Sequence, residues 1–343
     1  MRAVYFTEHG DVSKLTYGDL PDPVSAQDEV VVRVRACGVN HVDVWVRRGL
    51  PFLRLQYPFV LGQEIAGEIV SASCYSERLL AGARVVVHPG VGCGRCELCF
   101  SGNDHHCSQY QLLGKNLPGG YAELVAVPAS NVFPLPEEIS FESAACLPTV
   151  FTTAWNMVFD QADLKPGEWI LVHAAGSGVG SAAIQLASLA GARVIATAGS
   201  NEKAAKARSL GAEYVINYRT DDFLHHVRKL TGKRGVDVVI DHIGVDVWER
   251  SLLCLATAGR LVTCGASSGY QAVTDLRHVF FRQLRIFGAT CGSRATLMRI
   301  VQLVQEKKVR PVLDTVLPLT EAARAHTLLE ERQQFGKVVL VPA

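Results

Sequence analysis

The feature of the sequence that most restricts its fold is the alternation of short apolar runs with helix-like segments between residues 169 and 290. It begins with WILVHAAGSGVGSAAIQLA, from Trp169 to Ala187, which reads as an apolar strand, a glycine-rich turn and an amphipathic helix starting near Val179. The strand, residues 169–174, contains no acidic residue and no Lys or Arg, which is typical of a parallel strand covered on both faces. This first unit predicts the start of a parallel sheet.

The glycine-rich turn indicates a dinucleotide site. From Ala175 to Gly180 it reads A-G-S-G-V-G, so Ala175 and Ser177 replace the first two glycines of the G-x-G-x-x-G fingerprint. Small residues still let the backbone turn tightly and approach a pyrophosphate, which binds at the unpaired N–H groups and positive dipole end of the helix. A glycine-rich turn of an ordinary α/β protein is the alternative interpretation.

The same alternation repeats along the chain. Further strands are predicted at 192–198, 213–218, 236–243, 260–265 and 284–290. Helices are predicted at 201–210, ended by Gly211; at 220–231, with Thr220 as N-cap; at 246–256, ended by Gly259; and at 275–282. Six strands joined by such helices predict a doubly wound parallel sheet with right-handed crossovers.

Residues 1–144 lack this alternation. Their strand-like runs, separated by stretches rich in Pro and Gly, predict an all-β, barrel-like domain; the runs are 29–36, 64–71, 84–88 and 121–128. Pro134 and Pro136 precede a predicted linker and a helix at 141–157 that joins the domains. The last predicted elements, 293–306, 313–317, 321–331 and 337–341, are expected to return to the first domain.

Composition and charge exclude some partners. The 343 residues are 48% hydrophobic and 20% charged, as in ordinary globular proteins with room for two domains. A net charge of +1 gives no reason to expect a nucleic acid or a membrane as partner. The first residues, MRAVYFTEHG, are neither a signal peptide nor a membrane span, so a cytoplasmic location is the expectation.

Four of the ten cysteines have metal-site spacing. Cys93, Cys96, Cys99 and Cys107 form C-G-R-C-E-L-C-F-S-G-N-D-H-H-C, which can close a tetrahedral shell around a structural zinc with no open position. A Cys₃His set using His105 or His106 is the alternative. The other six cysteines are interpreted as buried thiols; they are Cys37, Cys74, Cys146, Cys254, Cys264 and Cys291.

The C-G-x-C-x-x-C-x-x-G-x-x-x-x-C lobe, the later A-G-S-G-V-G turn and the order of the domains resemble the medium-chain, zinc-type alcohol dehydrogenase and quinone oxidoreductase superfamily. The resemblance implies a GroES-like β-barrel catalytic domain at 1–144, completed by 293–343, and a Rossmann NAD(P)-binding domain at 145–292. It also implies a cleft between them and dimers joined through the last Rossmann strand, here around 284–290.

The sequence departs from the zinc enzymes where those carry a catalytic zinc. In the matching segments, Asn40 stands in place of the Cys ligand, Gln63 in place of the His ligand and Thr149 in place of the third ligand, while Glu64 remains. Val42 stands in place of the hydroxyl residue that relays the alcohol proton. Amide and hydroxyl oxygens are poor zinc ligands, so a tight catalytic zinc is not expected.

Without a Lewis acid, quinones and α,β-unsaturated carbonyls are easier to reduce than ordinary ketones, because hydrogen bonds can hold the phenolate or enolate oxygen. The candidate catalytic residues are Asn40, His41, Asp43, Gln63, Glu64 and Thr149. Asp43 is expected to orient His41, and Glu64 to form a structural ion pair. Polar loop residues without a catalytic role are the alternative, and Trp45, Tyr57 and Phe59 are either cleft walls or core.

The cofactor is predicted to be NADP(H). NAD-preferring domains place an acidic residue at the end of the second strand, where this chain has Ala198. Neighbouring donors and cations suit a 2′-phosphate, although two of them, Lys203 and Arg219, are equally interpreted as solvated charges. The expected cofactor-binding residues are Thr153, Gly176, Ser177, Gly178, Val179, Gly180, Ser200, Lys203, Tyr218, Arg219, Gly244 and Gly265.

The leading hypothesis is an NADPH-dependent reductase of quinones or activated alkenes that has no catalytic zinc and keeps one structural zinc per chain. One alternative is a zinc-dependent alcohol dehydrogenase with an unusual ligand set such as Glu64 with His41. Another is a non-catalytic NADPH-binding protein. A homodimer and a homotetramer are both compatible with the sequence.

Overall fold

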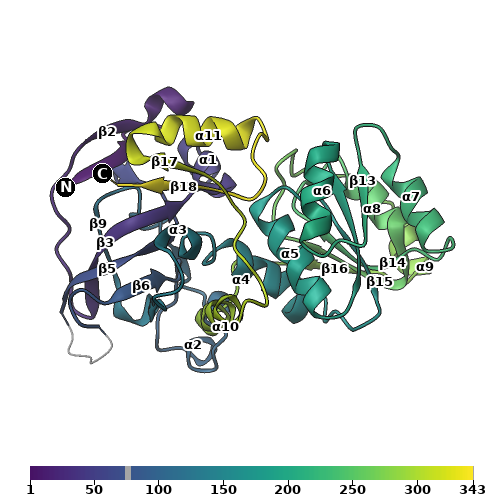
Figure 1. The fold of residues 1–343 in the computed structure, drawn as a ribbon, viewed down its shortest axis with the longest axis horizontal. Coiled ribbons are helices and arrows are strands. Elements are labelled where there is room, and N and C mark those ends of the chain that lie inside the picture. The colour runs from purple at the N-terminus through teal and green to yellow at the C-terminus, as the bar shows by residue number, and fades with distance from the viewer. Residues whose placement is uncertain (74–78, 343) are drawn as a thin grey trace. The chain divides into compact units, whose positions relative to one another are not determined.

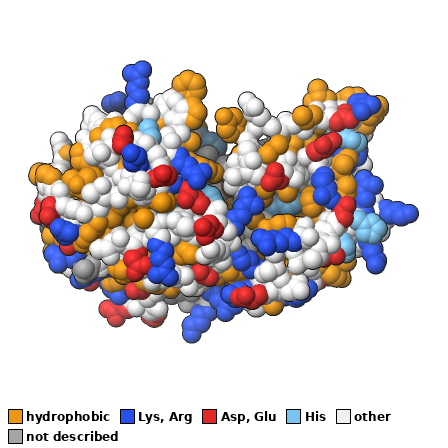
Figure 2. Space-filling view, turned by 90° about the horizontal axis from the view of Figure 1, so that it is seen from above, with side chains coloured by type: hydrophobic (Ala, Val, Ile, Leu, Met, Phe, Trp, Pro, Cys, Tyr) orange, Lys and Arg blue, Asp and Glu red, His pale blue; other side chains and the backbone are white. Residues whose placement is uncertain are grey.

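The computed structural model describes residues 1–73 and 79–342. The chain forms two compact units, which are shown in Figure 1. Unit 1 contains Met1–Thr152 and Gly292–Ala343, and unit 2 contains Thr153–Cys291. No described helix is both long and apolar enough to cross a membrane. Charged side chains of both signs are scattered over the face in Figure 2, consistent with the small net charge.

Unit 2 is built on a six-stranded parallel sheet with the order β13-β12-β11-β14-β15-β16. The strands are β11 (Trp169–Val172), β12 (Arg193–Ala198), β13 (Tyr214–Asn217), β14 (Val236–Asp241), β15 (Leu255–Thr263) and β16 (Arg285–Gly288). The strand order reverses between β11 and β14, which is where ligands bind in sheets of this kind. The prediction of a doubly wound sheet is confirmed.

Five helices connect these strands: α5 (Gly178–Leu189), α6 (Asn201–Ser209), α7 (Phe223–Leu230), α8 (Trp248–Cys254) and α9 (Leu276–Phe281). Two predicted details are wrong. Asp222, not Thr220, is the N-cap of α7, because its carboxylate accepts a hydrogen bond from the backbone N–H of His225. Gly259 does not end α8, since the chain is already in β15 from Leu255 onward.

Unit 1 contains a seven-stranded sheet with the order β10-β6-β5-β3-β18-β17, and β9 also pairs with β3. These strands are β3 (Glu29–Gly38), β5 (Glu64–Ala72), β6 (Arg84–Val87), β9 (Leu124–Pro128), β10 (Val132–Pro134), β17 (Leu313–Pro318) and β18 (Lys337–Val341). β18 pairs with β3 through Val339 and Leu340, so the end of the chain lies in this sheet. Two smaller sheets contain β1 (Arg2–Phe6), β2 (Thr16–Asp19) and β4 (Phe59–Val60), and β7 (Gly90–Val91) and β8 (Gln111–Leu112).

The helices of unit 1 are α1 (His41–Arg48), α2 (Glu97–Phe100), α3 (Phe141–Ala144), α10 (Arg294–Gln305) and α11 (Ala322–Glu330), and α4 (Val150–Trp155) begins in unit 1 and ends in unit 2. The single helix predicted at 141–157 is wrong, because the chain forms α3 and α4 with Pro148 between them. Proline has no N–H to donate and disfavours helical geometry in the residue before it. The break places the backbone N–H groups of Thr149 and Val150 at a new helix start.

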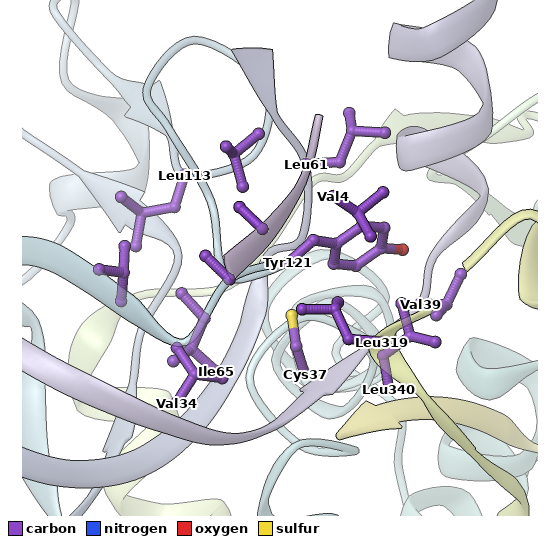
Figure 3. Packing of buried hydrophobic residues seen from close by; sticks show 14 of the residues in the cluster. Val4, Val34, Cys37, Val39, Leu61, Ile65, Leu113, Tyr121, Leu319 and Leu340 are labelled. Carbon is purple, nitrogen blue, oxygen red and sulfur yellow. The ribbon is translucent and has the colours of Figure 1, made fainter. Parts of the chain in front are cut away.

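The core of unit 1 forms around Tyr121, whose ring is fully buried beside Cys37 and Leu340 (Figure 3). The interpretation of the scattered cysteines as buried thiols fits Cys37, Cys146, Cys254 and Cys291. Cys264 is only partly buried, and Cys74 lies outside the described residues.

Candidate functional site

The four cysteines of the lobe meet around one point. Their Sγ atoms all lie within 4.8 Å of one another, with Cys93 and Cys99 4.0 Å apart and Cys96 and Cys107 3.8 Å apart. Zinc–sulfur bonds of about 2.3 Å in a tetrahedron require sulfur–sulfur distances of about 3.8 Å, so the geometry fits Zn²⁺. Within the described residues this cluster contains no histidine, which disfavours the Cys₃His alternative.

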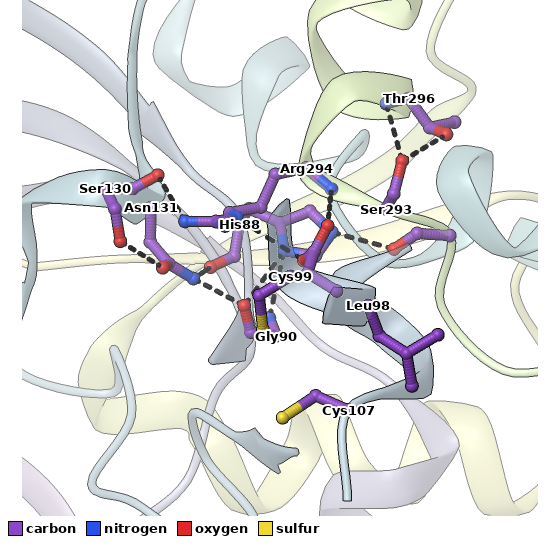
Figure 4. A network of polar contacts seen from close by, with 12 residues as sticks. His88, Gly90, Leu98, Cys99, Cys107, Ser130, Asn131, Ser293, Arg294 and Thr296 are labelled. Atoms are coloured by element: carbon purple, nitrogen blue, oxygen red, sulfur yellow. Dashed lines mark hydrogen bonds and ion pairs between the residues drawn. The ribbon is translucent and has the colours of Figure 1, made fainter. Parts of the chain in front are cut away.

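A buried polar network connects this lobe to the rest of unit 1 (Figure 4). Asp104 is 1% exposed and pairs with the Nε atom of Arg294 at the start of α10, at 3.4 Å. His88 donates from Nε2 to the carbonyl of Gly292 at 3.0 Å, and Asn131 donates from Nδ2 to the carbonyls of His88 and Gly90. Asp104 therefore ties the lobe to α10, while His88 joins the strand before the lobe to the second chain segment of unit 1.

A second polar group forms where β5, α1, α4 and β18 begin. Its centre is Glu64, which is fully buried. Oε1 of Glu64 accepts hydrogen bonds from the backbone N–H groups of Thr149 at 2.8 Å and Val150 at 3.1 Å, at the start of α4. Oε2 accepts from Nδ2 of Asn40 at 3.1 Å. The structure thus brings Asn40, Glu64 and Thr149 together.

Lys337 is the member of this group that the sequence did not predict. Its side chain is 4% exposed, and its Nζ lies 2.6 Å from Oε2 of Glu64, which is the ion pair expected of Glu64. Nζ also donates to Oδ1 of Asn40 and to the carbonyl of Val39, both at 2.6 Å. No motif marks Lys337, and it lies 297 residues from Asn40 along the chain.

Gln63 supplies a buried donor to the same group. Its side chain is 1% exposed, and its Oε1 accepts a long hydrogen bond of 3.5 Å from the hydroxyl of Thr149. Its Nε2 has no hydrogen-bond partner among the described residues. An unsatisfied buried donor is costly, and native structures place such groups mainly where a ligand or water binds.

Asp43 does not orient His41, which corrects the sequence prediction. Its carboxylate accepts from the backbone N–H groups of Asn40 at 2.7 Å and Gly62 at 3.2 Å, and from the hydroxyl of Tyr121 at 3.2 Å. Complete burial raises the pKa of Asp43 to about 7, although these hydrogen bonds lower it in part. Asp43 instead fixes the backbone on both sides of the polar group, since a side chain at the third position of α1 points back toward its N-cap.

A chain of hydrogen bonds, each donating in the same direction, ends at the carboxylate of Asp43. Arg47 has no acceptor atom, so its contact with Nδ1 of His326 makes that nitrogen the acceptor and leaves the proton on Nε2. Nε2 of His326 then donates to the hydroxyl of Tyr121 at 3.3 Å, and Tyr121 donates to Asp43. Arg47 also pairs with Glu330 at 2.6 Å, so α1 and α11 are held together by buried charge.

His41 lies beside the group with its ring 6.2 Å from that of Trp45. Burial, together with the positive charges of Lys337 and Arg332, lowers the pKa of His41 to about 4. A neutral imidazole can donate or accept one hydrogen bond but is a poor proton source near neutral pH. Of the aromatic candidates, Phe59 is 3% exposed and belongs to the core, whereas Tyr57 is 42% exposed.

In unit 2 the glycine-rich turn begins with backbone strain. Ala174 has φ of 47°, a left-handed conformation that is costly for a residue other than glycine and is often found at functional sites. Ser177 caps α5 by accepting from the N–H of Gly180 at 2.9 Å, and its hydroxyl lies 2.8 Å from Nε2 of His242, just after β14. A Cβ on Gly180 would come within 2.3 Å of the carbonyl oxygen of Ala174. This turn therefore requires the last glycine of the fingerprint.

Comparison with known proteins identifies the family. Residues 26–137 match the alcohol dehydrogenase GroES-like domain, and residues 178–306 match the zinc-binding dehydrogenase family. The chain is 31% identical to the NAD-dependent alcohol dehydrogenase of Sulfolobus acidocaldarius, over 99% of both chains. It belongs to the medium-chain dehydrogenase/reductase superfamily. It is accordingly an NAD(P)-dependent oxidoreductase.

Two further relatives are named for different activities. Quinone oxidoreductase 1 of Escherichia coli is 31% identical over 99% of both chains. A crystal structure of an NAD-dependent alcohol dehydrogenase is 47% identical, covers 99% of both chains and has a TM-score of 0.96. Family membership thus shows the fold and the reaction class, while quinone and alcohol chemistry both remain within the superfamily.

Zinc enzymes of this superfamily hold a catalytic metal at the positions of this polar group, so the residues present can be compared with what a zinc ion needs. The polar group of unit 1 does not fit one, because Asn40, Gln63 and Thr149 offer only neutral oxygens, and Glu64 is already engaged by Lys337 and two backbone N–H groups. Among the described residues, the group of ligands suited to a metal is the four-cysteine lobe.

The end of β12 is where members of this superfamily bind the adenosine ribose. Ala198 is 2% exposed and offers no carboxylate for the ribose hydroxyls. Ser200 caps α6 by accepting from the N–H of Lys203, and Gly199 packs so closely on Tyr218 that a Cβ would come within 2.7 Å of its hydroxyl. Tyr218 is 43% exposed, and Arg219 follows it on the surface.

The remaining predicted cofactor residues also lie in unit 2. Gly244 has φ of 93° and follows Asp241, whose Oδ1 accepts from the N–H groups of Ile243 and Gly244. Gly265 follows β15, and the hydroxyl of Thr153 lies 3.8 Å from the sulfur of Cys291. Their role in binding the nucleotide stays a prediction.

The buried histidines predict acid sensitivity. Burial lowers the pKa of His41 and His88 to about 4 and that of His173 and His326 to about 3. The unfolded chain binds these protons as the pH falls through about 6.5, but the folded chain does not, so the free energy of unfolding falls. Asp43 and Asp241, whose pKa values are raised to about 7 and about 6, oppose this partly.

We expect urea unfolding to show about 3 kcal/mol less stability at about pH 5 than at about pH 7. Four histidines act in this direction and two carboxyl groups act against it. Equal or greater stability at the lower pH would contradict the burial of these histidines in neutral form.

Proposed function

We propose that this protein is an NADPH-dependent reductase of quinones or α,β-unsaturated carbonyls that works without a catalytic zinc and carries one structural zinc. The observation that carries the proposal is the polar group of unit 1. Its residues replace the usual metal ligands with amides and a hydroxyl, and Lys337 pairs with the one remaining carboxylate, Glu64.

The chemistry of this group suits a substrate that delocalises the negative charge formed when the hydride is added. A bound nicotinamide supplies the hydride, and conjugate addition to an enone or quinone leaves negative charge on the carbonyl oxygen as an enolate or phenolate. Gln63 can donate to that oxygen from Nε2, which has no partner in the part of the chain that the structure describes, and Asn40 has a second N–H beside the one used by Glu64. Water then supplies the proton that completes the reduction. Donors fixed before the reaction stabilise developing charge without reorganisation.

The alternative is a zinc-dependent alcohol dehydrogenase with an unusual ligand set such as Glu64 with His41. Both oxygens of Glu64 already accept hydrogen bonds, and its charge is balanced by Lys337. Binding a dication there would place it beside the buried ammonium. The names of several relatives keep alcohol oxidation as the second candidate.

The deciding experiment measures turnover and zinc together. Protein purified without added metal is analysed for zinc by mass spectrometry and assayed with benzoquinone, cyclohexenone and ethanol, before and after mild chelation. We expect one zinc per chain and quinone or enone reduction that chelation leaves unchanged. Two zincs per chain, with ethanol turnover that chelation abolishes, would establish the alcohol dehydrogenase. NADPH binding without turnover of any substrate would favour the non-catalytic protein.

The choice of NADPH over NADH rests on the end of β12. Ala198 offers no acid to hold the ribose diol, and Lys203 and Arg219 supply positive charge for a 2′-phosphate. Several relatives are named NAD-dependent, which makes NADH the competing cofactor.

Replacing both Lys203 and Arg219 by Ala is expected to raise the KM for NADPH about tenfold and to leave that for NADH nearly unchanged, since only NADPH carries the extra phosphate. Lys206→Ala is the matched control, because Lys206 lies on the same helix and pairs with Glu202 at 2.9 Å. An equal change for both nucleotides would contradict the phosphate assignment.

We also propose a homodimer, with a homotetramer as the larger alternative. β16 pairs with β15 on one side and forms one edge of the described sheet of unit 2, with Ile286 40% exposed. Two such edges can pair about a twofold axis. Light scattering gives the mass that tests this.

The unlinked thiols of the lobe suit the reducing cytoplasm.

A further inference from the structure

The buried ammonium of Lys337 uses all of its donors inside the protein. A lysine ammonium has three N–H groups and no acceptor. Here they face the carbonyl of Val39, Oδ1 of Asn40 and Oε2 of Glu64, each at 2.6 Å, and the residue is 3% exposed. Lys337 therefore has no N–H left for a substrate, and any effect on chemistry must pass through its partners.

Asn40 lies between the two buried charges. Its Oδ1 accepts from Lys337, and its Nδ2 donates to Glu64 at 3.1 Å. The two ends of an amide have nearly the same shape, so only the hydrogen-bond partners decide which end faces where. A lysine cannot accept and a carboxylate cannot donate. Turning the amide over would therefore place its NH₂ group against the ammonium of Lys337 and its oxygen against the carboxylate of Glu64. The ion pair allows one orientation of Asn40.

This orientation decides whether Asn40 is a donor. With Nδ2 directed to Glu64, one of its two N–H groups is used and the second is available to an acceptor. The residue is 8% exposed, and it belongs to the same group as Gln63, whose Nε2 lacks a partner among the described residues. Two amide donors of neighbouring segments are thus held before any ligand arrives. Turned over, Asn40 would offer an oxygen where a developing anion needs an N–H.

We propose that Lys337 is a positioning residue of the reductase: with Glu64 it locks the Asn40 amide in the orientation that donates to the carbonyl oxygen of the substrate. The inference rests on the proposed function. It assigns to the last strand, β18, a part in the reaction, although Lys337 touches neither substrate nor cofactor.

The test replaces both charges at once. Lys337→Met alone leaves a buried carboxylate unpaired and endangers folding. In the double variant E64Q/K337M no buried charge remains at this position. The glutamine introduced in place of Glu64 can keep its oxygen on the N–H groups of Thr149 and Val150, and it presents an NH₂ group to Asn40. Asn40 then turns its oxygen toward that group and loses the donor orientation.

We expect kcat for benzoquinone to fall about 30-fold in E64Q/K337M while KM changes less than about threefold, because a donor to the developing anion is lost. Lys337→Arg, which keeps charge and donors, should retain most of kcat. The matched control is E168Q/R260M, which removes the Glu168–Arg260 pair of 2.7 Å in unit 2 and should lower stability without this loss of kcat.

A second comparison separates positioning from a structural role. In an Asn40→Ala background, adding E64Q/K337M should cost little further kcat, because the amide that Lys337 orients is gone. A full additional loss would overturn the inference, as would wild-type kcat in E64Q/K337M while the parent enzyme reduces quinones. A parent enzyme that reduces neither quinones nor enones would overturn the proposed function and this inference with it.

Discussion

Gln63→Met is expected to reduce quinones and enones about 100-fold more slowly than the wild type, which is the effect of removing one preorganised donor from an anion-stabilising site. Methionine keeps the length of the glutamine side chain and removes the amide. The loss should appear in kcat more than in KM, because the carbonyl oxygen gains its charge only in the transition state.

The same substitution should not destabilise the fold. Nε2 of Gln63 is buried without a partner among the described residues, and Oε1 makes one long contact of 3.5 Å with Thr149. Replacing an unsatisfied buried amide by an apolar group of similar shape is neutral or stabilising. Steady-state kinetics and thermal unfolding of the same preparation check both expectations.

Gln185→Met is the matched control for this substitution. Gln185 is 8% exposed on α5 and donates to the carbonyl of Ser181 at 3.2 Å. We expect it to lose a little stability and to retain kcat. A Gln63→Met enzyme with kcat within about threefold of the wild type would show that this donor has no part in stabilising the oxyanion.

Cys107→Ser is expected to abolish zinc binding and to lower the melting temperature by about 10 °C, equivalent to a few kcal/mol in a chain of this size. Cys107 is 5% exposed and one of four sulfurs that lie within 4.8 Å of one another. A serine hydroxyl is a poor zinc ligand, and the remaining thiolates would repel one another at this spacing.

The effect of losing zinc should extend beyond the lobe. Asp104, on the lobe, pairs with Arg294 of α10, so disorder in the lobe removes a buried ion-pair partner from α10. Cys264→Ser is the control, because Cys264 is a partly buried thiol outside the cluster. Zinc analysis and calorimetry decide the matter: a Cys107→Ser protein that keeps its zinc, or melts with the control, would contradict a structural metal in the lobe.

Local patterns were sufficient for several parts of the molecule. The doubly wound sheet followed from apolar runs and helix-like segments, because both periodicities are set within a few residues. The cysteine cluster followed from spacing, since three ligands lie within seven residues of one loop. The helix predicted at 141–157 is wrong because Pro148 lies between α3 and α4, and the start of α4 leaves the N–H groups of Thr149 and Val150 free to donate to Glu64.

The polar group of unit 1 was only partly predictable. Resemblance to the positions of metal ligands predicts Asn40, Gln63, Glu64 and Thr149. The structure brings Asn40, Glu64 and Thr149 into one hydrogen-bonded group with Gln63 at its side. Asp43 was given the wrong partner. Proximity along the chain suggested His41, whereas the helix geometry turns the carboxylate back to the N–H of Asn40 and on to Tyr121.

By itself the sequence determined the elements that depend on near neighbours: the strand–turn–helix at Ser177, the order of the domains and the thiol cluster. Only the tertiary structure decided which charge faces Glu64. Lys337 is an unremarkable residue at the start of a strand, and pairing of β18 with β3 carries it to Asn40 across 297 residues. The physical reason is that a buried charge is stable only beside a partner in space. Residues that become neighbours across a sheet have no characteristic spacing in the sequence.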